Sequence, residues 1–355
     1  MGIYLTVSTL MSSIIRPVTA EQLLFMVNNH LPHTQWTFGG AFRYDASLQV
    51  VIEQLSRSFP LRKPFSVAGG PACKWTLDWY AERRPMSLQT YAATLEKYAS
   101  LNVGVMLVFD NPYITDDMLS DVYCATLVKE LYRCDRVRKN SVCVASDKLA
   151  ARIREICPKL MVCCHPNRVI VEQNRRTPAM YNKLADLYSN VCLHPVDGAR
   201  PEIFTKIDHP EYFSVLVNDP LPRNCALRRE HLRLLAEIRK DPYNAELCLR
   251  RAQLVEKDGW HVVDPTTLRQ RATCNLTRNE TAALHAAGYK HYIVQGNQFR
   301  NEMTLLWDIF RCTLDNGPEL GNKSALIATS IMAAFGQPKN QMPSGLKGFQ
   351  FSNYE

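Results

Sequence analysis

The 355-residue sequence has no run approaching about 20 apolar residues, so no transmembrane helix is expected. Its first residues lack the basic segment and the small-residue cleavage site of a secretory signal, so we expect a cytoplasmic protein. It has no basic tail and no low-complexity arm. These absences disfavour a membrane protein, a secreted protein and a protein built around a disordered nucleic-acid-binding segment.

The sequence also lacks a cysteine framework, although it contains 12 cysteines. No CxxC pair is present, and several cysteines fall inside predicted buried elements, among them Cys124, Cys143, Cys157 and Cys312. Cysteine in such positions is typical of a small core residue in a reducing compartment.

Hydrophobic residues make up 46% of the chain and charged residues 21%, which are ordinary values for a globular protein with a large core. The formal net charge is +8, with basic clusters at residues 133–139, 168–176 and 223–239. This balance favours an anionic partner such as a nucleotide, a phosphosugar or nucleic acid. Most of the charges are nevertheless expected on solvated helix faces.

From residue 65 onward, short apolar runs of strand length alternate with helical patterns. Continuous apolar runs are typical of strands that are covered on both faces, and eight of them are what a (β/α)8 TIM-like barrel requires. The predicted strands are residues 65–69, 103–109, 141–145, 160–164, 190–194, 213–217, 271–275 and 290–294.

The alternative is an open, doubly wound α/β sheet, because a sequence does not show whether the first and last strands pair. No glycine-rich dinucleotide fingerprint follows the first predicted strand, which weakens that alternative. We expect an N-terminal helical extension over residues 1–60, with a loop or short strand near residue 36. The barrel would span residues 61–315 with a helical insertion at 229–256, and a C-terminal helix and tail would occupy 316–355.

In TIM barrels, functional side chains lie where the strands end and the following loops begin. The stretch 213–231 is the richest such junction: an apolar strand ends at Asn218-Asp219, a proline-containing turn follows, and Arg223, Asn224 and Cys225 precede a helix. Polar residues also follow the other predicted strands. Asx, Ser and Pro are common at such turns for capping alone, so each position has a structural as well as a functional interpretation.

Three arrangements of these residues would carry chemistry. His165, His194 and Asp219, with Asp110, would form a His/carboxylate site for a divalent metal, and the first three would otherwise supply acid–base catalysis. Cys225 and Cys274, with Cys163 or Cys192, would hold an iron–sulfur cluster, a weaker prediction because no compact spacing supports it. Third, Arg168, Arg223 and Lys74 would clamp a phosphate or carboxylate. The predicted substrate-binding residues are Arg168, Arg223, Asn218, Asn224, Lys74, Asn275 and Gln295.

Two segments resemble the superfamily of collagenase-like peptidases and their relatives, the oxygen-independent hydroxylases of RNA and ubiquinone precursors. Residues 216–231 (LVNDPLPRNCALRREH) look like the asparagine-then-cysteine segment of that superfamily, and residues 286–299 (AAGYKHYIVQGNQF) resemble its closing helix–glycine–strand pattern. The resemblance implies a TIM-like barrel and, in several members, a cysteine-ligated iron–sulfur cluster. Only Cys225 stands in the matching segment here, since residues 219–221 occupy the place of an earlier cysteine.

The sequence therefore predicts an enzyme whose barrel mouth acts on an anionic small molecule or a nucleic-acid-linked substrate. Two alternatives stay open. One is a non-catalytic binding or scaffold protein with a basic surface for nucleic acid or a partner. The weaker one is an iron–sulfur-dependent, hydroxylase-like enzyme.

Overall fold

The protein is described from a computed structural model, which covers residues 31–43, 45–46, 48–49, 52, 65–77, 86–135, 139–171, 176–219, 225–257 and 276–295. Parallel strands form a closed barrel in chain order, each pairing with the next. They are β1 (Gln35–Gly39), β2 (Phe65–Gly69), β3 (Gly104–Phe109), β4 (Ser141–Val144), β5 (Met161–Cys164), β6 (Asn190–Cys192), β7 (Phe213–Leu216) and β8 (His291–Val294).

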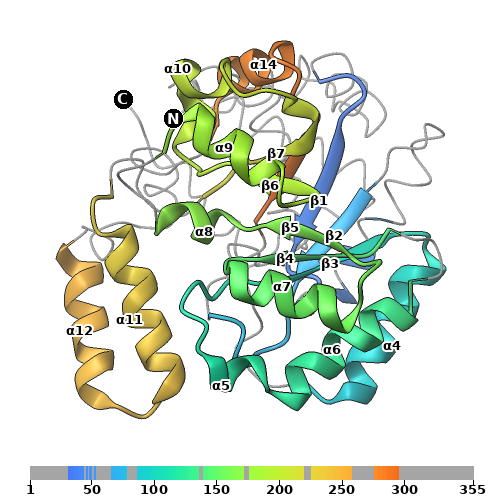
Figure 1. Cartoon of the computed structure of the whole chain (residues 1–355), viewed down its shortest axis with the longest axis vertical. Helices are drawn as coiled ribbons and strands as arrows, with labels where there is room; N and C mark the ends of the chain where they lie inside the picture. The colour runs from blue at the N-terminus through green and yellow to red at the C-terminus, as the bar shows by residue number, and fades with distance from the viewer. Residues whose placement is uncertain are drawn as a thin grey trace, which may run out of the picture.

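Helices follow the strands and cover the outside of the barrel (Figure 1). The α-helices are α4 (Leu88–Ser100), α5 (Asp116–Leu119), α6 (Val122–Arg133), α7 (Asp147–Ile156), α8 (Pro166–Ile170), α9 (Pro178–Ala185), α10 (Pro201–Phe204), α11 (Arg228–Lys240), α12 (Ala245–Lys257) and α14 (Arg278–Ala286). Two short 3-10 helices, η2 (Asp197–Ala199) and η3 (Pro210–Tyr212), lie before β7.

The barrel closes between its first and last strands. β1 and β8 pair in parallel, with Gln35 opposite His291 and Phe38 opposite Val294. This pairing confirms the predicted (β/α)8 TIM-like barrel and excludes the open doubly wound sheet, in which those two strands would be edges.

The first strand was assigned wrongly from the sequence. Residues 35–39 were predicted to be part of a helical extension, with at most a short strand near residue 36, whereas they form β1 and the barrel begins there. The reason is the alternation of this strand: Trp36 and Phe38 belong to the outer core, while Thr37 lies between them. A strand with a polar inner face does not show the continuous apolar run that identified the others.

Several predicted elements lie outside the described residues. These are the strand at 271–275, the helices at 21–29 and 302–314, the C-terminal region 316–355 and most of the helix at 46–58. In the barrel, β7 (Phe213–Leu216) and β8 (His291–Val294), which were predicted as the sixth and eighth strands, pair directly with each other, so no strand stands between them.

Side chains pack in two shells, one inside the barrel and one between the strands and the helices. The inner shell consists of small and medium apolar residues and three thiols: Ala68, Met106, Val108, Cys143, Cys163, Cys192, Leu216 and Ile293. The larger outer shell contains the big aromatic side chains, such as Trp75 and Tyr181. Side chains alternate along each strand, so the residue two positions after an inner-shell residue also points toward the barrel axis.

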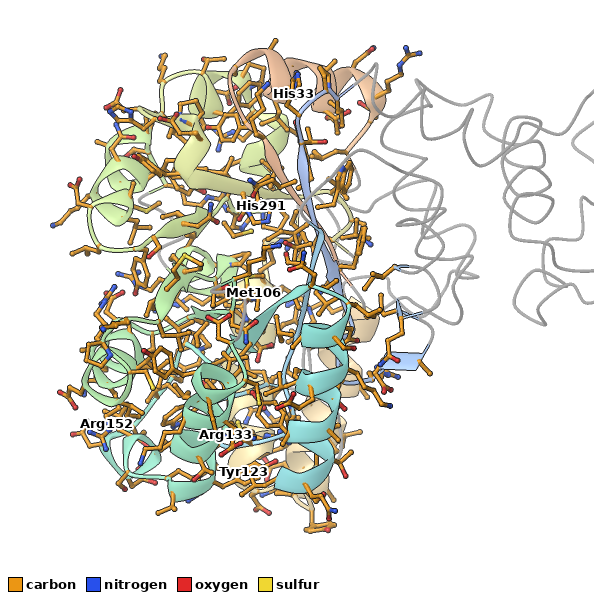
Figure 2. The ribbon with its side chains drawn as sticks, turned by 90° about the vertical axis from the view of Figure 1, so that its right-hand side faces the viewer. His33, Met106, Tyr123, Arg133, Arg152 and His291 are labelled. Carbon is orange, nitrogen blue, oxygen red and sulfur yellow. The ribbon has the colours of Figure 1, made fainter. Side chains whose placement is uncertain are left out.

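A polar group occupies the inner side of the barrel below this apolar layer. The hydroxyl of Thr37 lies 2.6 Å from Ser66 Oγ and 2.7 Å from His291 Nε2. Figure 2 shows His291 and Met106 among the strands near the centre of the molecule. Burial lowers the pKa of His291 to about 4, so its imidazole is neutral at pH 7.

Residues 228–257 form the helices α11 and α12, which pack on one another beside the barrel (Figure 1). The N-terminal end of α11 follows β7 and brings Arg228 into the protein interior, where it is 2% exposed. In the part of the chain that the structure describes, no helix is long and apolar enough to cross a membrane.

Candidate active site

The carboxyl ends of the strands carry a set of buried polar side chains. His165 follows β5, His194 follows β6, Asn218 and Asp219 follow β7, and Gln295 follows β8, each of them at most 4% exposed. His194 lies two residues after Cys192 of the inner shell, and Gln295 lies two residues after Ile293. The alternation therefore directs both side chains toward the barrel axis. In barrels of this class, that end is the face that carries function.

A cavity of about 40 Å³ lies at this end of the barrel. Its polar side chains are His165 and Gln295, while the rest of its lining is apolar or backbone. The remaining lining residues are Gly39, Gly40, Ala68, Gly69, Met106, Val108, Cys143, Pro166, Cys192, Leu216 and Ile293.

Glycines follow β1 and β2, and Gly39, Gly40 and Gly69 line the same cavity as His165 and Gln295. Gly40 has a φ of +92°, a conformation that favours glycine. A Cβ atom added to Gly70 would lie 2.5 Å from the carbonyl oxygen of Val108. The close approach at Gly70 is therefore to the backbone of the neighbouring strand β3.

His165 caps the helix α8. Its Nδ1 accepts a hydrogen bond from the backbone N–H of Asn167 at 3.1 Å, which leaves the ring proton on Nε2 in the neutral form. Burial lowers the pKa of His165 to about 3. The imidazole is therefore a neutral hydrogen-bond donor at pH 7, and an imidazolium acid at this position is disfavoured.

His194 is fixed in the same tautomer by its own turn. Its Nδ1 accepts a hydrogen bond from the backbone N–H of Val196 at 3.1 Å, so Nε2 carries the proton. Within the described part of the chain, this buried Nε2 atom has no hydrogen-bond partner. Burial lowers the pKa of His194 well below its usual value, and the positive charges of Arg176, Arg228 and Arg200 lower it further.

A buried carboxylate lies next to this histidine. The Tyr181 hydroxyl accepts from the backbone N–H of His194 at 3.0 Å and donates to Oδ2 of Asp197 at 2.7 Å. Arg176 and Arg200 form ion pairs with Asp197, at 3.3 and 3.4 Å. Burial raises the pKa of Asp197, and the charge of Arg176 opposes that shift.

A second buried ion pair links β7 to α11. Asp219 Oδ2 accepts from Arg228 Nη1, and the two side chains are 1% and 2% exposed. The carboxylate that the sequence assigned to acid–base catalysis or metal binding is thus bound to a guanidinium. This ion pair joins the end of β7 to the first residue of α11.

Asn218 positions the residue that follows β8. Its Oδ1 accepts from the backbone N–H of Gln295 at 2.6 Å, and its Nδ2 donates to the backbone carbonyl of the same residue at 3.2 Å. Both the oxygen and the nitrogen of the Asn218 side chain therefore bond to the backbone of Gln295, so Asn218 positions that residue.

Two of the predicted anion-clamp residues do not join this site. Lys74 has a side chain 58% exposed and pairs with Asp121 at 3.2 Å. Arg168 makes two hydrogen bonds to Asp147, at 3.0 and 2.9 Å. Ser146 caps α7, which leaves the carboxylate of Asp147 for Arg168. The arginines that do lie near His194 are Arg176, Arg200 and Arg228.

The predicted metal site is not assembled. Among the residues that the structure describes, no group of three or more His, Cys, Asp or Glu side chains is arranged to hold a metal ion. Asp110 accepts from the backbone N–H of Leu77 at 2.6 Å, while Asp219 is paired with Arg228. Both carboxylates of the predicted set are thus bound to groups of the protein itself.

The described cysteines give no support to an iron–sulfur cluster. Cys163 and Cys192 lie in the inner shell among apolar side chains, where burial raises the pKa of each thiol to about 12. Cys225 is half-buried, and Cys274 lies outside the described residues. Arg223, Asn224 and Asn275, which were predicted to bind substrate, also lie outside them.

The residues that provide the charges and hydrogen bonds around His194 were not identified from the sequence. Arg228 lies within the basic cluster at 223–239, but charge alone does not separate a buried arginine from its exposed neighbours. Tyr181, which lies on α9, was not among the predicted site residues. The available signal was the position of Asp197 in the loop that follows a buried strand, since a buried carboxylate requires partners.

The buried histidines make stability depend on pH. The unfolded chain takes up protons near the ordinary histidine value of about 6.5, whereas folded His165 and His291 do so only near about 3 and about 4. Their contribution is present above about pH 6.5 and is lost as the pH falls from there to about 3 for His165 and about 4 for His291, by about 1.4 kcal/mol per pH unit for each residue. Urea unfolding at several pH values measures this slope.

The matched variant is His291→Gln, which is expected to lower the slope by about 1.4 kcal/mol per pH unit below about pH 6. Replacing the exposed His209 with glutamine serves as the control for the loss of one imidazole from the chain. A His291→Gln protein with the wild-type slope would show that this imidazole is not held neutral.

The fold and the mouth define a (β/α)8 barrel protein with its polar site at the carboxyl ends of the strands. No family model matches the sequence, and no curated protein matches it. Among solved structures, the chain is similar to the U32 peptidase Mk0906, at 12% sequence identity and a TM-score of 0.44, over 76% of this chain and 94% of that chain. The fold assignment rests on the strand pairing of this chain itself, and the resemblance seen in residues 216–231 and 286–299 stays a prediction.

Proposed function

We propose that this protein is an enzyme that binds an anionic small molecule, bearing a phosphate or a carboxylate, at the barrel mouth beside His194. The observation that carries this proposal is the buried Nε2–H of His194, which has no acceptor among the described residues. A buried donor without a partner costs about 1–3 kcal/mol, and an oxygen of a bound ligand would satisfy it.

The charges around this donor favour an anion over a neutral acceptor. Arg176, Arg200 and Arg228 carry three positive charges, and the carboxylates of Asp197 and Asp219 carry two negative ones, so the cluster has a net charge of +1 when all five are ionised. An anion that accepts from His194 Nε2–H would also gain from this positive field.

Neutral histidines support one kind of catalytic role. Because the pKa values of His165 and His194 are both lowered, neither ring is an imidazolium at pH 7. A neutral N–H donor stabilises negative charge that develops on a substrate oxygen, and it needs no reorganisation to do so. We assign this role to His194, with Arg228 as the residue that adds positive potential.

The direct experiment is a titration with inorganic phosphate and with acetate at constant ionic strength, followed by calorimetry and thermal unfolding. Binding to the folded state raises the unfolding free energy by about 2.7 kcal/mol at a ligand concentration 100-fold above Kd. Lys74→Ala, which removes an exposed charge outside the mouth, is the matched control and keeps the response. A response that potassium chloride reproduces would contradict the proposal.

The formal net charge of +8 favours a second candidate, a non-catalytic barrel whose basic surface binds nucleic acid. Such binding would weaken steeply with salt and would not depend on His194. Titrations with generic single-stranded RNA at two salt concentrations, on the wild type and on a His194 variant, separate the two functions.

A further inference from the structure

The side chain of Gln295 is a buried amide without hydrogen bonds. It is 1% exposed, and neither its Nε2 nor its Oε1 has a partner in the described part of the chain. It lines the cavity at the barrel mouth, two residues beyond Ile293 of the inner shell. A buried donor and acceptor that both stay unused in the protein point to a ligand that uses them.

The backbone of Gln295 is held in place by hydrogen bonds to Asn218. Asn218 accepts from the N–H of Gln295 and donates to its carbonyl, so the main chain after β8 is fixed by two hydrogen bonds. Asn218 is thus a positioning residue. Gln295 can present its amide to a ligand without first giving up a bond of its own, which favours binding.

The cavity beside Gln295 is small, and His165 is its other polar side chain. Its volume of about 40 Å³ matches roughly three water molecules, since each needs about 10–15 Å³. The side chains of Met106, Val108, Leu216 and Ile293 form much of its wall. Such a space suits a flat, uncharged group better than an ion, because ions are costly to bury without a counter-charge.

We propose that Gln295 forms a subsite for a planar uncharged group that carries a donor and an acceptor side by side. A glutamine amide offers one acceptor oxygen and an N–H donor next to it, so its complement is a primary amide or the edge of a nucleobase. A trans peptide bond does not match, because its C=O and N–H point in opposite directions. Taken with the proposed anion site, on which this second statement rests, the substrate is an anion that also carries such a group.

The test uses acetamide, acetate and acetamidinium as probes, which share one shape and differ in their donors and acceptors. Ligand-observed NMR titrations on the full chain are expected to show acetamide binding at least about ten-fold more tightly than the other two. Gln295→Glu converts the donor–acceptor face into two acceptors, and this variant is expected to prefer acetamidinium. Gln295→Leu, which keeps an apolar wall, is expected to lose acetamide binding by about ten-fold or more.

A change of preference from acetamide in the wild type to acetamidinium in Gln295→Glu cannot be explained by misfolding, because both proteins would still bind a probe. A wild type without preference for acetamide, or a Gln295→Leu variant that binds it unchanged, would overturn the subsite. If acetamide binding behaves as expected while inorganic phosphate does not bind, the proposed anion site fails and the subsite stands. Adenine and uracil, titrated in the same way, show whether a nucleobase edge binds more tightly than the simple amide.

Discussion

Replacing Arg228 with methionine is expected to lower the free energy of unfolding by about 3–5 kcal/mol. Arg228 and Asp219 are 2% and 1% exposed and form an ion pair between α11 and the end of β7. Removing the guanidinium leaves the carboxylate of Asp219 buried without its counter-charge, and the solvation of that charge is not recovered inside the protein. Urea unfolding at pH 7 measures the loss.

The double variant Arg228→Met/Asp219→Leu separates the charge from the packing. With both charges removed, most of the stability is expected to return, because an apolar pair of similar volume replaces a buried ion pair at little cost. Arg152→Met breaks the exposed pair with Glu155 and changes stability by less than about 1 kcal/mol. If the double variant were as unstable as the single one, packing rather than charge would explain the role of Arg228.

Replacing His194 with leucine is expected to weaken the binding of inorganic phosphate by about 10- to 100-fold. The variant removes the Nε2–H donor, and a hydrogen bond to a charged group contributes about 1.5–3 kcal/mol. Folding itself is expected to tolerate the change. The side chain of His194 gives up only the bond that Nδ1 accepts from Val196, and an unpaired buried N–H disappears with it. Calorimetric titration at constant ionic strength measures the affinity.

His194→Gln is the conservative partner of this variant, because a glutamine amide also donates from a nitrogen at the end of the side chain. It is expected to recover part of the affinity that leucine loses, while Tyr181 and Asp197 keep their places below it. If His194→Leu bound inorganic phosphate with wild-type affinity, His194 would not be part of the binding site, whatever the effect of the substitution on stability.

Most of the barrel could be predicted from the sequence because seven of its strands are short apolar runs. The exception, β1 (Gln35–Gly39), alternates between large outer side chains and the inner Thr37, which bonds to Ser66 and His291. A strand whose inner side chain finds its partners on other strands cannot be recognised from its own residues. Barrel closure could not be predicted from local sequence either, because the β1–β8 pairing joins segments about 250 residues apart.

The positions of the mouth could also be predicted, because parallel strands bring their carboxyl ends to one face. His165, His194, Asn218, Asp219 and Gln295 all lie there. Their partners could not be predicted. Arg168 lies three residues after His165 and was expected to clamp a ligand, yet it binds Asp147, whereas Arg228 from a later helix reaches Asp219. Which charges neutralise one another depends on tertiary distances that sequence spacing does not contain.

The central claim is that His194 holds a proton on Nε2 at the mouth and offers it to an anion. Nitrogen-15 NMR of the histidine rings tests this most directly, since it reports the tautomer and the protonation state of each ring. The account predicts that His194 stays in the neutral Nε2–H form from about pH 6 to about pH 8, and that inorganic phosphate shifts its Nε2 and attached proton signals. A ring that titrates near its ordinary value of about 6.5, or one whose signals phosphate leaves unchanged, would contradict it.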